Sequence, residues 1–315
     1  MPPIEVLRRR AELLASTREF FAARDVLEVD TPLLGEGVVV EEHIDPIPCQ
    51  VQVEGSNATR YLLTSPEGPM KRLLAAGSGP IYQFAHAFRD GEVGRRHAPE
   101  FTMLEWYRPG FDHHQLMDEV EAFVRTLIPE VGDNVFERKT YREVFLESAS
   151  IDPFATSIEE IRRTCERLAI AVPADFENGS LDDALDLLLV CHIEPQLGAE
   201  VPLFVHDYPE SQAALAQIHE DAAGRRVAER FELYIQGIEL ANGYHELLDA
   251  SEQRRRFEAA NQARVENDRP ALPLDADLLE ALEIGMPACA GVALGFDRLV
   301  MLATGATDIR DVRFG

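Results

Sequence analysis

Residues 88–107, FRDGEVGRRHAPEFTMLEWY, place several arginines and a histidine just before a strand-like run that carries a carboxylate. Side chains alternate along an extended chain, so Phe101, Glu105 and Tyr107 share one face of this strand. Because glutamate is almost never buried without a partner, we expect Glu105 to face a cation that the protein itself does not supply. Upstream, the planar guanidinium of Arg89 suits phosphate oxygens. The segment therefore predicts a site for one anionic and one positively charged ligand, whereas a surface hairpin would explain the arginines but not Glu105.

A second strand-like segment, residues 231–247 (FELYIQGIELANGYHEL), carries Glu232, Glu239 and Glu246 at intervals of seven. Three carboxylates within one apolar segment suggest Mg²⁺ and an ammonium group as ligands. Magnesium prefers a few carboxylates together with nucleotide phosphates. An edge strand with one solvated face is the alternative, and the spacing supports both equally.

Near the end, residues 291–305 (GVALGFDRLVMLATG) predict a glycine-flanked strand that passes into an apolar helix. Gly291 and Gly295 would let a ligand approach the backbone closely, and Arg298 opens the helix. A helix-start packing motif is the alternative, and the glycines alone favour it.

Together these segments resemble motifs 2 and 3 of the class II aminoacyl-tRNA synthetases, specifically the lysyl branch. The fragments that carry the resemblance are TSPE (64–67), HAPEFTMLEWY (97–107), ELANGYHEL (239–247) and GVALGFDRLVML (291–302). VLEVDTP (26–32) resembles motif 1, the dimer-forming element. The resemblance runs from about residue 4 to 312. It implies an α+β fold, with a class II synthetase-like, mostly antiparallel sheet flanked by helices, and a homodimer formed through motif 1.

The start of the chain sets it apart from a lysyl-tRNA synthetase. It begins with an amphipathic segment in which Ile4, Leu7, Ala11 and Leu14 form one stripe. A lysyl-tRNA synthetase has an anticodon-reading domain ahead of that point, so we expect one catalytic domain over residues 1–315 and no anticodon-binding domain.

The charge balance also bears on the partner. The 315 residues include 56 acidic and 30 basic residues, a net charge of −26. Affinity for nucleic acid depends on Lys and Arg that neutralise phosphates, so this balance disfavours tRNA. The basic runs Arg8–Arg10 and Arg254–Arg256 are predicted to be solvated helix faces.

A free-standing lysyl-type core resembles the EpmA family of elongation factor P–(R)-β-lysine ligases. That resemblance implies activation of (R)-β-lysine with ATP and Mg²⁺, and its transfer to a lysine side chain of elongation factor P. Ala293 is the sharpest discriminator, because lysyl-tRNA synthetases usually have glycine at that motif 3 position. One methyl group in a tight pocket is worth about 1–3 kcal/mol. It would disfavour an α-amine and tolerate a β-amine, unless Ala293 merely fills core space.

The resemblance assigns roles to the residues that match the motifs. ATP would be bound by Arg89, Glu92, His97, Phe101, Glu239, Leu240, Gly295 and Arg298. The amino acid would be held by Ser65, Glu67, Glu105, Tyr107, Asn242, Glu246 and Ala293. Arg89 and Arg298 are expected to be catalytic, and Glu232 with Glu239 to hold Mg²⁺.

Motif 2 departs from the family pattern at two positions. The family has Arg-x-Glu, but Arg89 is followed by Asp90, Gly91 and Glu92, so the carboxylate comes one residue late. Either the loop lets Glu92 reach the adenine amino group, or Asp90 or a backbone group replaces it. Ala98 stands where the family has asparagine, which removes a polar group near the nucleotide.

The flanking elements follow from local signals. Ser65 and Pro66 predict a helix that starts with Ser65 as N-cap and runs to Gly77. Residues 110–200 predict a helical insertion packed on the sheet. Within it, Ser157 starts a capping box and a helix to about Ala169. Ser180 opens another helix through Cys191.

Residues 204–219, FVHDYPESQAALAQIH, resemble the lysyl-type segment that lines the substrate side. Ser211 and Gln212 are candidate contacts there, with core packing as the alternative. The prolines of residues 266–275 predict a loop.

The histidines and cysteines carry no ligand spacing. His113 and His114 are predicted to lie on the surface, and His245 to point away from Glu246. The four cysteines (Cys49, Cys165, Cys191 and Cys289) are predicted to be reduced and mostly buried thiols. Without a signal peptide or a long apolar run, the chain is expected to be cytoplasmic and not bound to a membrane.

Three alternatives stay open. One is a truncated lysyl-tRNA synthetase-like enzyme that activates L-lysine, which the charge and Ala293 disfavour. Another is a catalytically silent binding paralogue, which Gly91 and Ala98 alone support. The third is an amide-forming enzyme of the asparagine synthetase type, which Glu105 and ELANGYHEL disfavour.

Overall fold

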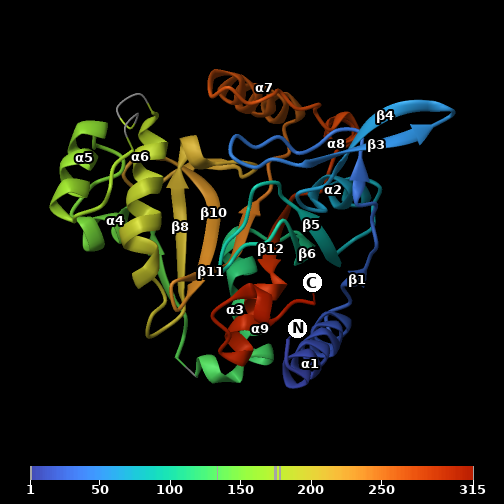
Figure 1. The fold of residues 1–315 in the computed structure, drawn as a ribbon, viewed down its shortest axis with the longest axis horizontal. Helices are drawn as coiled ribbons and strands as arrows, with labels where there is room; N and C mark the ends of the chain where they lie inside the picture. Colours follow the sequence, from blue (N-terminus) through green and yellow to red (C-terminus); the bar gives the residue numbers. More distant parts are fainter. Residues whose placement is uncertain (1, 133, 174–175, 177–178, 315) are drawn as a thin grey trace.

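The computed structural model describes residues 2–132, 134–173, 176 and 179–314, and a large, mostly antiparallel sheet forms its centre (Figure 1). The strand order is β1-β5-β6-β12-β11-β10-β8-β7, and β9 pairs with β10. Among the described strands, β1–β5 and β7–β8 are the parallel pairs. The strands are β1 (Leu27–Glu28), β5 (Ile81–Phe88), β6 (Glu100–Pro109), β7 (Glu137–Thr140), β8 (Leu203–Pro209), β9 (Ile218–Glu220), β10 (Arg226–Ile235), β11 (Ile238–His245) and β12 (Cys289–Gly295).

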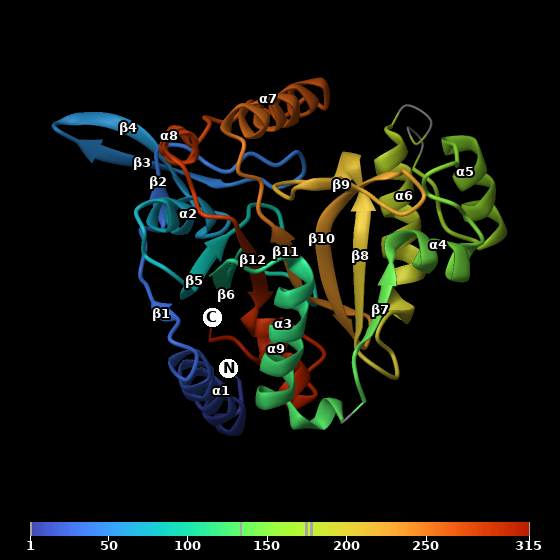
Figure 2. The same cartoon turned by 180° about the vertical axis from the view of Figure 1, so that it is seen from behind.

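Side chains alternate along β6, so one face of the sheet packs in the hydrophobic core and the other lines a cavity. Leu104 and Trp106 are fully buried in the main hydrophobic core. That face is covered by α1 (Ile4–Ala22), α3 (His113–Leu127) and α9 (Phe296–Thr304), and Figure 2 shows α3 lying across the strands. Phe101, Glu105 and Tyr107 line a cavity on the other face, as their spacing predicted.

Helix α1 buries a different stripe from the expected one. Leu13, Thr17, Phe20 and Phe21 face the core, and Phe21 stacks on Tyr82 with ring centroids 4.3 Å apart. Ile4 and Ala11 of the predicted stripe are exposed instead. The prediction was wrong for these two residues, whereas Leu7 and Leu14 are half-buried and Leu14 packs against the core. The aromatic residues at the end of the helix set which face packs against the sheet.

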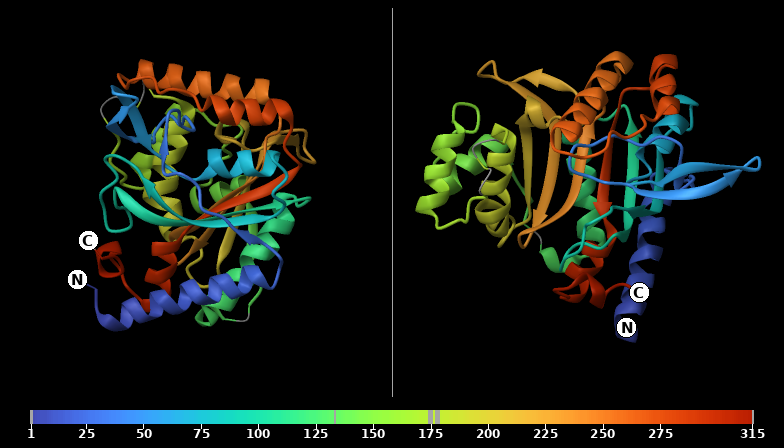
Figure 3. Two further views of the ribbon diagram at one scale, coloured as in Figure 1. Left: turned by 90° about the vertical axis from the view of Figure 1, so that its right-hand side faces the viewer. Right: turned by 45° about the horizontal axis from the view of Figure 1, so that its top comes forward.

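The basic run in α1 is not a solvated face throughout. Arg8 is exposed, but Arg10 forms an ion pair of 2.6 Å with Asp297, which is buried in α9. Arg10 also donates a hydrogen bond of 2.8 Å to the Thr102 hydroxyl. Arg313, near the other end of the chain, lies 3.4 Å from the same aspartate, and the two ends of the described chain lie close together in all views (Figure 3).

Three further helices lie beyond the other face, near a hairpin that projects from the body (Figure 1). They are α2 (Glu67–Ala75), α7 (Ala250–Glu266) and α8 (Ala276–Ile284), and the hairpin is β3 (Ile47–Val53) and β4 (Ser56–Leu62) with β2 (Leu34–Gly35) beside it. Helix α2 begins at Glu67, with Pro66 at the N-cap position and Ser65 accepting a 3.4 Å hydrogen bond from the Glu67 amide. The start therefore lies one residue later than predicted. In α7, Arg256 donates to the carbonyls of Ala214 and Ala216, so this run is not wholly solvated either.

The described part of segment 110–200 consists mainly of helices and the loops between them, and it also contains strand β7. Besides α3 it contains α4 (Tyr141–Ala149), α5 (Ile158–Arg167) and α6 (Leu181–Leu188), which lie beside β8 in Figures 1 and 2. Ser157 and Ser180 cap α5 and α6 as predicted. Both helices end earlier than expected, because Ala169 takes a positive φ and a π-helical turn, Leu189–Ile193, follows α6. Strand β7 extends the sheet; residues 133, 174, 175, 177 and 178 are outside the described part.

The segment 231–247 is a hairpin rather than one strand. β10 and β11 pair antiparallel around a turn at Gln236 and Gly237, where both residues have positive φ. No helix in the described residues is long and apolar enough to cross a membrane.

Candidate active site

One cavity collects nearly all of the predicted site residues from segments far apart in the chain. They come from the start of α2, the loop between β5 and β6, strands β6, β11 and β12, and the start of α9. The predicted residues that line the cavity are Ser65, Glu67, Arg89, Glu92, His97, Phe101, Glu105, Tyr107, Glu239, Leu240, Asn242, Glu246, Ala293, Gly295 and Arg298. Of the residues to which the family resemblance assigned a role in binding or catalysis, Glu232 alone lies elsewhere.

One end of the cavity holds three carboxylates around one buried ammonium group. The Lys71 Nζ lies 2.6 Å from a carboxylate oxygen of Glu67 and 2.6 Å from one of Glu246. Glu105 is 2 % exposed and accepts a 2.7 Å hydrogen bond from the Tyr107 hydroxyl. Among the described residues, no basic side chain forms an ion pair with Glu105, although the charge of Lys71 acts to lower its pKa.

Burial controls the charge state of this group. It raises the pKa of Glu105 to about 8, with the Glu67 carboxylate adding to the effect. Burial also raises the pKa of Glu246 to about 7, although Lys71 opposes the shift. For Lys71, burial lowers the pKa, but the carboxylates of Glu246 and Glu67 more than offset it and raise the pKa overall. Lys71 therefore stays protonated. Its single positive charge does not neutralise all three carboxylates when they are ionised, so this end of the cavity has an excess of negative charge.

The β12 strand shapes the floor of this end. Ala293 pairs with Glu105 of β6 on one side and with Asn242 of β11 on the other, and its methyl group lines the cavity rather than the core. At Gly291 a Cβ would lie 2.3 Å from the Tyr107 ring and 2.5 Å from the Glu246 carboxylate. The protein's own side chains thus already require glycine there, and Gly291 also lines the cavity.

The other end of the cavity is rich in guanidinium groups. Arg298 donates to the Glu239 carbonyl at 2.6 Å and to its carboxylate at 3.2 Å, and its Nη2 lies 2.8 Å from the His97 ring. Burial, then the nearby charge of Arg298, lowers the pKa of His97, so the ring is a neutral acceptor. Arg89 lies over the Phe101 ring, with its guanidinium carbon 5.0 Å from the centroid. These planar forks suit phosphate oxygens.

The Glu92 carboxylate, which comes one residue later than the glutamate of the family's motif 2, lies in the cavity. Glu92 lines the wall, and one of its oxygens is 3.7 Å from the Arg89 guanidinium. Gly91 takes φ +76°, a conformation that favours glycine and lets the loop carry the extra residue. The Asp90 side chain is not among the cavity lining, whereas the Ala98 side chain is.

Glu232 and Glu239 differ in their environment. Glu239 is in the cavity, where burial and the Glu232 carboxylate raise its pKa. Glu232 lies behind it, with one oxygen paired to Arg230 and the other accepting from the hydroxyls of Tyr208 (2.7 Å) and Tyr234. The Glu239 carboxylate faces the cavity with Arg298 as its ion-pair partner among the described residues, so a magnesium–phosphate group would compete with one partner there. At Glu232 it would have to displace three.

Sequence reasoning missed Lys71. Its position four residues after Glu67 in a predicted helix was the signal, because residues at that spacing lie on the same face. Ser211 and Gln212, predicted as possible substrate contacts, lie outside the cavity. They hydrogen-bond to Asp182 in α6 and attach that helix to the sheet.

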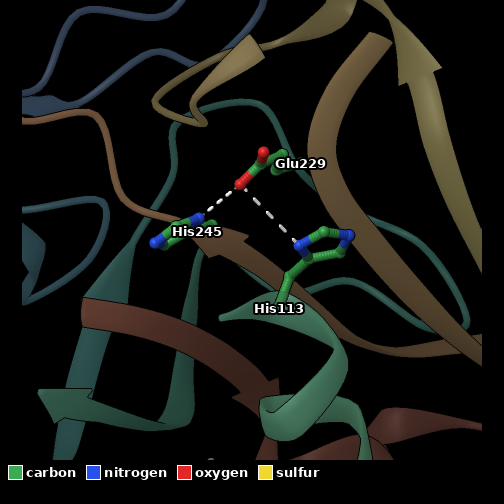
Figure 4. Close-up of side chains that lie close together, drawn as sticks. All are labelled: His113, Glu229 and His245. Carbon is green, nitrogen blue, oxygen red and sulfur yellow. Dashed lines mark hydrogen bonds and ion pairs between the residues drawn. The ribbon is translucent and has the colours of Figure 1, made fainter. Parts of the chain in front are cut away.

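The surface prediction for the paired histidines was wrong for His113, whereas His114 is exposed as predicted. His113 is 4 % exposed, and its ring lies on the helix-covered face of the sheet near Glu229 and His245 (Figure 4). His245 points away from Glu246, as predicted. Of the cysteines, Cys165 and Cys289 are buried, but Cys191 is exposed and Cys49 is half-buried.

The chain is similar to known proteins over nearly its whole length. The family model for class II tRNA synthetases (D, K and N) matches residues 4–314. An elongation factor P–(R)-β-lysine ligase from Yersinia enterocolitica is 47% identical over 314 residues, covering 98% of this chain and 94% of that protein. Proteins of the same name from Vibrio vulnificus (49% identical, 98% and 94% covered) and Proteus mirabilis (48%, 97% and 93%) are similar over the same extent.

Proposed function

The chain belongs to the elongation factor P–(R)-β-lysine ligase family within the class II tRNA synthetases, and we propose that it joins (R)-β-lysine to a lysine side chain of elongation factor P with ATP. The observation that carries the proposal is the composition of the cavity. Guanidinium groups gather at one end, and carboxylates exceed the one internal ammonium at the other.

The carboxylate end suits a substrate with two amines. Glu67, Glu105 and Glu246 together carry three negative charges when ionised, and Lys71 balances one of them. Two ammonium groups would balance the other two of these three charges, and a lysine isomer supplies two. Glu41 also lines the cavity, and burial raises its pKa. The Ala293 methyl lies beside Glu105 and Asn242, so it narrows the space where the amine nearer the carboxyl group would lie. This arrangement favours a β-amine over an α-amine.

The first chemical step needs alignment and charge neutralisation. An oxygen of the substrate carboxylate, ionised because its pKa is about 4, attacks the α-phosphorus; the new O–P bond forms as the bond to pyrophosphate breaks. Arg89 and Arg298 would hold the phosphate oxygens as negative charge shifts onto the leaving group. The Phe101 ring would stack on the adenine base, and Glu92, which lines the same cavity, would accept a hydrogen bond from the adenine amino group.

Magnesium fits the guanidinium end through Glu239. Its carboxylate lines the cavity, and Mg²⁺ is bound by one or two carboxylates together with substrate phosphates. When bound, the ion neutralises phosphate charge. Glu232, through its position behind Glu239, would complete or orient this site.

The first step yields an acyl adenylate, and the second step transfers its acyl group to the acceptor. The nitrogen of an acceptor lysine attacks the adenylate carbonyl carbon, the C–O bond to AMP breaks, and the nitrogen loses a proton. Elongation factor P is the proposed acceptor and tRNA is not, because the net charge of −26 opposes phosphate-rich partners. A homodimer through residues 26–32 is part of the proposal.

Two linked assays test the function. The first is Mg²⁺-dependent ATP–pyrophosphate exchange with (R)-β-lysine, (S)-β-lysine, L-α-lysine and asparagine. We expect the strongest exchange with (R)-β-lysine. The second measures transfer of labelled product to purified elongation factor P or to tRNA. Preference for L-α-lysine with transfer to tRNA would instead identify a synthetase-like enzyme, and no exchange in folded protein would identify a silent paralogue.

A further inference from the structure

We propose that His113, Glu229 and His245, assisted by His219, form a binding site for one divalent transition-metal ion, with Zn²⁺ as the preferred ion. The site is separate from the cavity described above. It lies on the helix-covered face of the sheet, where α3, β10 and β11 meet (Figure 4).

The geometry brings three ligand types to one point. One ligand atom from each of His113, Glu229 and His245 lies within 4.8 Å of the other two, and among the described residues this is the one such group of three. The Glu229 Oε2 contacts the His245 Nδ1 and lies 3.9 Å from the His113 Nδ1. Two ligands bound tetrahedrally to zinc at about 2.1 Å lie roughly 3.4 Å apart, so small side-chain shifts would close the site.

A fourth donor is next to the three. The His219 Nδ1 lies 3.3 Å from Glu229 Oε1, the carboxylate oxygen that does not face the other two rings. The rings of His113 and His219 have their centroids 6.5 Å apart. Three imidazoles and one carboxylate make a donor set for zinc, copper or nickel rather than for magnesium or calcium.

The second, independent observation is the state of His113. It is 4 % exposed, and neither of its ring nitrogens has a hydrogen-bond partner among the residues that the structure describes. A buried polar group without a partner is costly, so this ring calls for a ligand that the protein alone does not provide. Burial, with the neighbouring His114, lowers its pKa to about 4, and a neutral imidazole is the form that binds metal.

The metal-free alternative is an ion pair between His245 and Glu229. It accounts for that contact and for the raised pKa of His245, which the Glu229 hydrogen bond causes. It leaves His113 unsatisfied, and it gives no reason for His219 to approach the same carboxylate. A metal ion would satisfy all four side chains, with loss of the proton that His245 carries in the ion pair.

The experiment is metal titration of the full, untagged protein after treatment with a chelator. We expect isothermal titration calorimetry with ZnCl₂ to show one equivalent per chain, and Co²⁺ to give the visible absorption bands of a tetrahedral site. Zinc should raise the melting temperature in a concentration-dependent way, because it binds the folded state. Excess MgCl₂ should produce neither the bands nor the shift.

Variants locate the ion. Glu229→Gln and His113→Asn should each weaken zinc binding by at least about tenfold, the lower end of the loss seen when even outer contacts of a metal site are removed. His86→Ala is the matched control, because His86 lies 3.3 Å from Glu100 in an exposed histidine–glutamate pair. His219→Ala changes a more accessible ligand, so it tests the site even if the variants at the buried positions do not fold. No zinc uptake by the wild-type protein, or uptake unchanged in folded Glu229→Gln, would overturn the proposal.

Discussion

At the scale of single residues, the site depends on carboxylates that the fold leaves short of positive charge. Glu105 illustrates this, because it is buried beside Glu67 and receives only the Tyr107 hydroxyl as a hydrogen-bond donor among the described residues. Its place on the strand predicted such a role. Lys71 forms ion pairs with Glu67 and Glu246. Sequence reasoning did not predict this, because whether a lysine in a helix points inward depends on how the helix packs.

Replacing Glu105 with glutamine tests its role directly. Hydrogen bonds to charged groups contribute about 1.5–3 kcal/mol, so Glu105→Gln should lower kcat/KM for (R)-β-lysine-dependent exchange by roughly 10- to 100-fold. The KM for ATP should change little, since the substitution is at the other end of the cavity. Glu280→Gln, at an exposed position of α8, is the control and should behave as wild type. Equal loss in both variants would contradict the assignment.

The raised pKa values predict how stability depends on pH. Glu105 and Glu246 have pKa values of about 8 and about 7 in the folded protein, against about 4.3 for an unfolded glutamate. Between these values the folded state binds more protons than the unfolded state, so the free energy of unfolding should fall as pH rises from about 5 to about 8. A substrate ammonium group requires ionised partners, so ligand binding should tighten over the same range.

Thermal unfolding with and without (R)-β-lysine measures both effects. The melting temperature of the free protein should be lower at about pH 8 than at about pH 6, and the shift produced by the ligand should be larger at about pH 8. Glu105→Gln should flatten both trends, because glutamine does not titrate. A ligand-induced shift that is the same at both pH values would contradict the raised pKa values of the two carboxylates.

Ala293 provides a prediction on specificity. Ala293→Gly removes one methyl group between Glu105 and Asn242, and one methyl in a tight pocket is worth about 1–3 kcal/mol. The ratio of kcat/KM for L-α-lysine to that for (R)-β-lysine should rise by about tenfold in pyrophosphate exchange. Ala290→Gly, on the opposite face of the same strand, is the matched control. An unchanged ratio would mean that the methyl only fills space.

At the scale of elements, the sequence located most of the structure around the site. The strand–helix unit 289–304, the N-caps at Ser157 and Ser180 and the loop after α7 are all as predicted, because each depends on local signals. Two of the errors arose where tertiary contacts decide. The face that α1 buries and the burial of His113 each depend on a partner that is remote in sequence. The turn inside 231–247 is instead local, and Gly237, which has a positive φ, was a signal that sequence reasoning missed.

Arg10 ties α1 to the helix that carries Arg298, and its loss should be measurable. Arg10→Met keeps an apolar stem but leaves the buried Asp297 with Arg313 at 3.4 Å as its remaining ion-pair partner. Breaking a buried ion pair costs about 3–5 kcal/mol; Arg10 is partly exposed, so we expect a loss of about 1–3 kcal/mol in the free energy of unfolding. Urea denaturation measures it, with the exposed Arg8→Met as control. Coincident unfolding curves for the two variants would refute this role.

At the scale of the whole molecule, the cavity exists only because segments that are distant in the chain meet over one sheet. Residues 65–71, 89–107, 239–246 and 291–298 each carry part of the chemistry. The resemblance to a known family assigned roles to the residues that carry most of the chemistry, but not to Glu41, Tyr244 and Asp297, which also line the cavity. It did not predict that Glu232 already has three partners, since that depends on Arg230 and two tyrosines from neighbouring positions of the sheet.

The proposed homodimer places its interface at the edge of this sheet. Strand β1 pairs with β5 alone among the described strands, and Leu27 within it is 56% exposed, as is Ile4 at the start of α1. An exposed apolar side chain on an edge strand is a natural contact for a second copy of the chain. Leu27→Asp would bury a charge in that interface, so it should convert a dimer into a monomer of 35.2 kDa in light-scattering measurements. Ile284→Asp, at a position 76% exposed in α8, should leave the dimer intact. If wild type is monomeric at micromolar concentration, or both variants stay dimeric, the interface lies elsewhere and residues 26–32 serve only the fold.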